Sequence, residues 1–168
     1  MALTRHERNR KVDLNPLEMI EKVVAANDWP FDRTSDREIA VEVAGRWCDY
    51  RMFFIWREDL SALYFTCMFD TRITEDKRAP VTELICLANE RLWLGHFDVS
   101  SEDRLPMYRH TILTRGWQTL PPELLEDMVD IALGECERFY PALQFVVWAG
   151  HTPGDAIASA MMDTVGEA

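Results

Sequence analysis

Histidines and cysteines are the residues of this sequence that could bind a transition metal, and their spacing does not favour it. The four histidines are His6, His96, His110 and His151, and no two have the helical H-x-x-x-H spacing that directs two imidazoles at one ion. His96 and His110 fall on adjacent predicted strands, where a nearby cysteine could complete a zinc site. A hydrogen-bonded histidine within a sheet is far commoner, so we expect no bound metal and no other cofactor.

The cysteines are widely separated and show no metal-binding or redox spacing. Cys48, Cys67, Cys86 and Cys136 contain no C-x-x-C pair, and each lies in an apolar segment. Such cysteines usually behave as small buried hydrophobic residues in a reducing compartment. The polar N-terminus has no apolar signal-peptide region, so the expected location is the cytoplasm.

Other chemical signatures are also missing from the sequence. There is no G-x-S-x-G nucleophile elbow. The segment Gly150-His151-Thr152-Pro153-Gly154 superficially resembles a phosphate loop, but it lacks the lysine and is better explained as the start of a helix. Asp28, Asp32 and Asp36 are spaced too loosely for a calcium loop and suit turns and helix caps. We therefore expect a protein that is not an enzyme.

Charge and hydropathy narrow the class of partner. The chain has 168 residues and a formal net charge of −11, which disfavours nucleic-acid binding. Residues 1–14 form a basic segment that we expect to be a flexible arm, and residues 15–168 are expected to form a single domain. No apolar run approaches the roughly 18 residues that a membrane span needs.

The expected elements alternate between helical and strand patterns. Asn15 and Pro16 are typical of a helix start, and residues 38–45 alternate apolar and polar side chains as a half-buried strand does. Helices are expected from residues 16, 81, 122 and 153, and strands over residues 38–45, 48–57, 62–70, 94–100 and 105–113. The order is a helix, a three-stranded antiparallel meander, a helix, two strands, a long helix that Pro141 would kink or divide, and an extra C-terminal helix. This pattern predicts an α+β fold.

The second and third predicted strands are apolar on both faces. In the second, Tyr50 and Trp56 share one face, while Phe53 and Ile55 lie on the other. A sheet covered on one side only should be polar on its second side, so we expect something to cover both. The residues predicted to form a partner or dimer interface are Tyr50, Phe53, Ile55, Trp56, Tyr64 and Met68.

Three short motifs resemble the YbjN-domain family of bacterial proteins. They are Leu87-Ala88-Asn89-Glu90, Leu94-Gly95-His96-Phe97 and Tyr108-Arg109-His110-Thr111, within a similarity spanning about residues 15–147. The resemblance implies the type III secretion chaperone-like fold and a small cytoplasmic protein that forms a homodimer. The family is often described as regulating sensory transduction. Asn89, Gly95 and Tyr108 would then be structural, with Asn89 shaping the exit of its helix.

Two functions follow as hypotheses. The first is a non-enzymatic, chaperone-like regulatory module that forms a homodimer and binds an unidentified protein partner. The second is a sensor of small molecules with an aromatic pocket between the long helix and the sheet. The aromatic residues expected to line that pocket are Trp56, Phe65, Trp93, Trp117 and Trp148.

Overall fold

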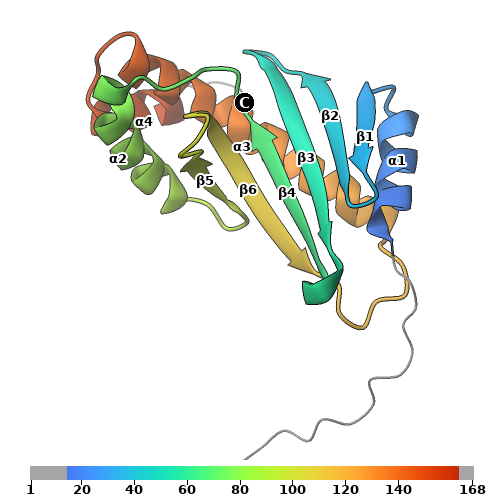
Figure 1. Cartoon of the computed structure of the whole chain (residues 1–168). Helices are drawn as coiled ribbons and strands as arrows, with labels where there is room; N and C mark the ends of the chain where they lie inside the picture. The colour runs from blue at the N-terminus through green and yellow to red at the C-terminus, as the bar shows by residue number, and fades with distance from the viewer. Residues whose placement is uncertain (1–14, 163–168) are drawn as a thin grey trace, which may run out of the picture.

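The structure, a computed structural model, describes residues 15–162 as an antiparallel sheet packed against helices (Figure 1). The helices are α1 (Pro16–Ala26), α2 (Arg78–Asn89), α3 (Pro122–Val147) and α4 (Pro153–Met162), with short 3-10 turns η1 (Glu58–Leu60) and η2 (Glu75–Lys77). The strands are β1 (Phe31–Ser35), β2 (Glu38–Ala44), β3 (Asp49–Arg57), β4 (Ala62–Met68), β5 (His96–Val99) and β6 (Pro106–Leu113). The predicted α+β class is confirmed.

The six strands form one sheet in the order β1-β2-β3-β4-β6-β5, and every neighbouring pair is antiparallel. The meander therefore has four strands rather than the predicted three. The additional strand β1 occupies the segment predicted as a loop, where Asp32 pairs with Ala40 and Asp36 lies in the turn before β2.

The helix starts follow the predicted chemistry. The side chain of Asn15 accepts a hydrogen bond from the Leu17 N–H at 3.1 Å, and Pro16 occupies the first helical position of α1. The hydroxyl of Thr152 accepts one from the Asp155 N–H at 3.2 Å, so the glycine-flanked segment before α4 is a helix cap. Pro141 does not divide α3, which continues to Val147.

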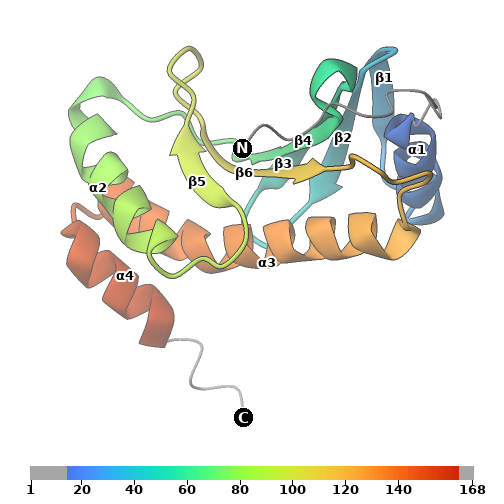
Figure 2. The same ribbon diagram turned by 90° about the horizontal axis from the view of Figure 1, so that it is seen from below.

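One face of the sheet carries the core. Helices α1 and α3 lie on this inner face, and α3 runs across several strands (Figure 2). Its buried side chains include Met128, Ala132, Cys136 and Phe139, which were predicted as the apolar stripe of this helix. Helices α2 and α4 pack against one another and against α3 beside the β5 edge. None of the described helices covers the opposite, outer face (Figure 2).

Candidate functional site

The structure divides the six predicted interface residues between the two faces of the sheet. Tyr50 is 1% exposed and Trp56 is 7% exposed, because the alternation of β3 directs both into the core. Their assignment to an exposed interface needs correction: they are core residues. Phe53, Ile55, Tyr64 and Met68 point to the outer face, and each is only partly buried.

These four side chains form a contiguous surface, which we call the outer-face patch. Ile55 lies directly opposite Tyr64 in the β3–β4 pairing, and Phe53 lies opposite Thr66, next to Met68 along β4. Directly opposed residues on one face of an antiparallel pair have Cβ atoms about 4.5–5.5 Å apart, so their side chains touch. The result is an apolar centre on a sheet face that no described helix covers (Figure 2).

Ion pairs lie on both sides of the outer-face patch. On one flank Arg51 Nη2 lies 3.4 Å from Glu42 Oε1, and on the other Arg109 Nη1 lies 2.5 Å from Asp98 Oδ2. The Arg109 guanidinium also lies 5.3 Å from the centre of the Tyr64 ring, within cation–π range. Neither Asp98 nor Arg109 was among the predicted interface residues, although its position along the strand places Arg109 on the outer face beside Thr66.

Asn89, Gly95 and Tyr108 form the predicted structural unit at the β5 edge. The Asn89 side chain accepts a hydrogen bond from the Phe97 N–H at 2.7 Å and donates one to the Phe97 carbonyl at 3.0 Å. The side chain therefore supplies hydrogen-bond partners to the Phe97 backbone at the edge of the sheet, as a further strand would. The Asn89 side chain thus joins the end of α2 to β5.

Gly95 allows the close approach of Tyr108. A Cβ at Gly95 would lie 2.3 Å from the Tyr108 ring, and the backbone there has φ +64. The Tyr108 hydroxyl donates to the Leu94 carbonyl at 2.8 Å, and burial raises the pKa of Tyr108 to about 12. The phenol therefore stays protonated at neutral pH and serves as a structural donor.

His96 and His110 do not form the metal site that the sequence left open. His96 lies opposite Arg109, which places it on the outer face, whereas His110 lies opposite Phe65 on the inner face. Burial, with a smaller contribution from His96, lowers the pKa of His110. Within residues 15–162, no group of three or more histidine, cysteine or acidic residues is arranged to hold a metal ion.

Three cysteines lie in the core and one does not. Cys48, Cys67 and Cys136 are buried as expected, but Cys86 is exposed on α2, and all four are free thiols. Burial raises the pKa of Cys48 to about 12 and also raises that of Cys136. Such thiols are protonated and weakly reactive.

A cavity of about 160 Å³ lies between α3 and β6, where the sequence suggested a ligand pocket. Its walls are mainly aliphatic, with Tyr108 and His110, and none of the five predicted aromatic residues lines it. Trp56 and Phe65 are in the core, whereas Trp93 is 98% exposed and Trp117 and Trp148 also face solvent. Its volume is close to the roughly 150 Å³ of an engineered apolar cavity that binds benzene.

The fold and the uncovered face together define a small α+β domain that presents one side of an antiparallel sheet. The chain belongs to the YbjN family, whose model, described as "Putative bacterial sensory transduction regulator", matches residues 16–145. It is similar to the crystal structure of YbjN, "a putative transcription regulator from E. coli", with a TM-score of 0.53 and 9% identity over 74% of this chain and 88% of that one. That likeness shows the fold. No curated protein matches the sequence. Among the described residues, no helix is long and apolar enough to cross a membrane.

Proposed function

We propose that this protein is a non-enzymatic regulatory module of the bacterial cytoplasm that pairs with a second copy of itself through the outer-face patch. The observation that carries the proposal is the apolar centre of Phe53, Ile55, Tyr64 and Met68 on a sheet face without a covering helix among the described residues. An apolar centre with a polar rim is the usual anatomy of a protein interface.

The charges around the patch support a symmetric partner. Each flank carries one acid and one arginine, Glu42 with Arg51 and Asp98 with Arg109. When two copies face each other across a two-fold axis, a flank of one copy meets either the same flank or the opposite flank of the second copy. In both arrangements each charge can meet its opposite, as a self-complementary interface requires.

The four free cysteines support the cytoplasmic part of the proposal. Among them Cys67 and Cys136 approach one another from β4 and α3 without forming a disulfide. Unpaired thiols of this kind are typical of a reducing compartment. The regulatory part rests on membership of the YbjN family and its description.

The dimer is tested by measuring molar mass with light scattering over a micromolar concentration range. The wild type should have the mass of two chains, and Phe53→Glu should have the mass of one, because a buried unpaired carboxylate is strongly unfavourable. Ile131→Glu is the matched control, since Ile131 is an exposed hydrophobic residue of α3, 37% exposed, on the helix side of the sheet. This variant should remain dimeric.

Three results would count against the proposal. A wild type that stays monomeric throughout the range would exclude the homodimer. A dimer that Ile131→Glu dissociates and Phe53→Glu does not would place the interface on the helical side. The third result is global unfolding of Phe53→Glu, which circular dichroism detects and which would show that Phe53 belongs to the core of the monomer.

A further inference from the structure

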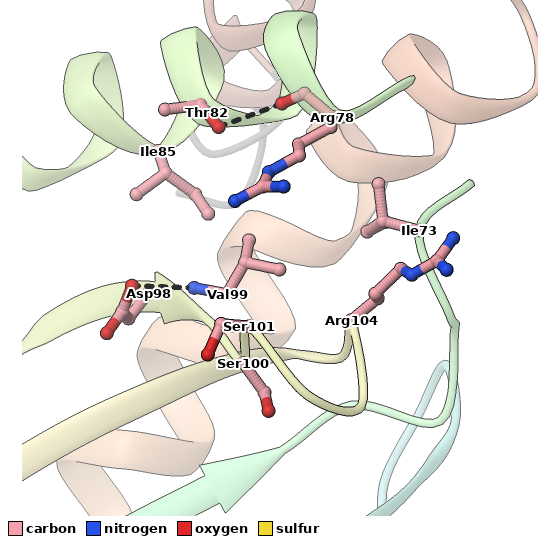
Figure 3. Close-up of a pocket in the computed structure, with 9 residues that line it drawn as sticks. All are labelled: Ile73, Arg78, Thr82, Ile85, Asp98, Val99, Ser100, Ser101 and Arg104. Atoms are coloured by element: carbon pink, nitrogen blue, oxygen red, sulfur yellow. Dashed lines mark hydrogen bonds between the residues drawn. The ribbon is translucent and has the colours of Figure 1, made fainter. Parts of the chain in front are cut away.

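A separate cavity of about 250 Å³ lies between α2 and the loop that connects β5 to β6. Figure 3 shows Arg78 and Ile85 projecting from α2 on one side, with Val99 and Arg104 on the other. The lining thus includes two arginines and two apolar side chains, and in Figure 3 the two guanidinium groups point in different directions. None of the four residues of the outer-face patch lines the cavity, although Asp98, whose ion pair with Arg109 lies beside that patch, does. Binding at this cavity therefore does not depend on the proposed dimer.

The two arginines are not committed to strong partners within the protein. The ion pair of Arg78 with Glu75 has a 3.9 Å separation, and both side chains are mostly exposed. Exposed pairs of this kind contribute little stability, so the Arg78 guanidinium is available to a ligand. In the described part of the chain, the Arg104 side chain has no hydrogen bond or ion pair.

The backbone of Arg104 is held in place from both sides. Its N–H donates to the Ser100 carbonyl at 2.9 Å, and its own carbonyl accepts from the Ile73 N–H at 2.8 Å. Its φ of +57 lies in the left-handed region, where glycine or asparagine is the ordinary choice. An arginine at this position supplies a cationic side chain from a fixed point on the cavity wall.

The remaining charge on the wall is already compensated. Asp98 accepts hydrogen bonds from Arg109 at 2.5 Å and from the Val99 N–H at 2.8 Å, so its carboxylate opposes an incoming anion less than a free one would. The start of α2 contributes few donors, because the Arg78 N–H bonds to Glu75 and Pro80 has none. Recognition of an anion here depends on the two guanidinium groups.

We propose that this cavity binds a small organic phosphate monoester. Its phosphate would be held by Arg78 and by Arg104, whose exposed side chain would turn toward Arg78 from the direction shown in Figure 3. The Ser101 hydroxyl would be a further donor, and the organic part would contact Ile85 and Val99. A phosphate monoester carries nearly two negative charges at pH 7, which two arginines match, and guanidinium is well suited to bidentate contact with phosphate oxygens. A volume of 250 Å³ holds a phosphate and a single ring.

The probe is phenyl phosphate, followed by amide chemical shifts in two-dimensional NMR of the full-length chain. The largest changes should occur at residues 99–104 and 78–85. Arg104→Gln should weaken binding about tenfold, as expected for loss of a charge-assisted hydrogen bond, and so should Arg78→Gln. Arg115→Gln is the control, because Arg115 is an exposed arginine outside the cavity, and it should bind as the wild type does.

Inorganic phosphate, benzoate and phenol separate the parts of the proposal. Phenyl phosphate should bind more tightly than any of the three. Equal affinity for inorganic phosphate would overturn the role of the apolar wall, and equal affinity for benzoate would overturn the preference for a dianion. Equal affinity for phenol, shifts scattered over the surface, or unchanged binding in both arginine variants would overturn the site itself.

Discussion

Replacing Asn89 with alanine should destabilise the junction between α2 and β5, because this side chain connects the two elements. Asn89 makes two hydrogen bonds with the backbone of Phe97, at 2.7 and 3.0 Å. Because β5 is an edge strand, no neighbouring strand can replace them on that side. Phe97 is 3% exposed and packs between Tyr108 and Phe139, so a displaced β5 disturbs the core directly.

The magnitude follows from the groups that lose their partners. Each hydrogen bond contributes about 1 kcal/mol net, and an unsatisfied buried donor or acceptor costs about 1–3 kcal/mol. Water reaches the edge strand and lowers that cost, and alanine gains up to about 0.7 kcal/mol in helix propensity over asparagine. The expected loss in free energy of unfolding is about 2–3 kcal/mol, which corresponds to a decrease in melting temperature of about 5–10 °C.

Urea unfolding and amide hydrogen exchange measure this loss. Asn89→Ala should lower the unfolding midpoint and should remove the exchange protection of the Phe97 amide. Asn89→Asp keeps the acceptor and should show a smaller change at that amide, while Glu90→Ala alters an exposed neighbour and serves as the control. A loss below about 0.5 kcal/mol, or one no larger than that of Glu90→Ala, would refute the reasoning.

Two further predictions concern a glycine pair and a histidine. Gly95→Ala should lower the free energy of unfolding by at least about 1 kcal/mol, because its Cβ would collide with the Tyr108 ring at a φ of +64. Gly134 lies within α3 with open space around it, so Gly134→Ala should raise the free energy of unfolding by up to about 1 kcal/mol. Urea unfolding measures both variants, and changes of the same sign in the free energy of unfolding would contradict this reasoning. The lowered pKa of His110 means that the unfolded chain binds its proton more readily. The free energy of unfolding should therefore fall as the pH decreases through about 6.5 and level off below the folded-state pKa. Urea denaturation at several pH values should show a weaker pH dependence for His110→Gln. A profile identical to that of the wild type would contradict the prediction.

The sequence predicts most elements because their local patterns are strong. The predicted bounds of β2, β3, β4 and β6 and the predicted apolar stripe of α3 match the structure closely. The exception is β1, Phe31–Ser35, which is mainly polar and in which no residue is fully buried. An edge strand of this kind is defined by its pairing with β2, and no local pattern marks it.

The candidate site is less accessible to sequence reasoning. Alternation shows that Tyr50 and Phe53 lie on opposite faces of β3, but both faces are apolar and cannot be ranked by hydropathy. The position of α1 and α3 decides which face becomes the core. The cavity beside Arg104 is harder still, because its walls come from α2, β5 and a loop that are separated in sequence and share no motif.

The position of the helices also determines what can cover the outer-face patch. Helices α1 and α3 are occupied by the inner face, and α2 and α4 pack beside the β5 edge. A cover for Phe53 and Ile55 must then come from outside residues 15–162, either from the ends of this chain or from another molecule. The basic arm predicted at residues 1–14 lies outside the described part. If that segment were the cover, Phe53→Glu would lower the stability of a monomer without changing its mass, whereas a dimer interface changes the mass itself.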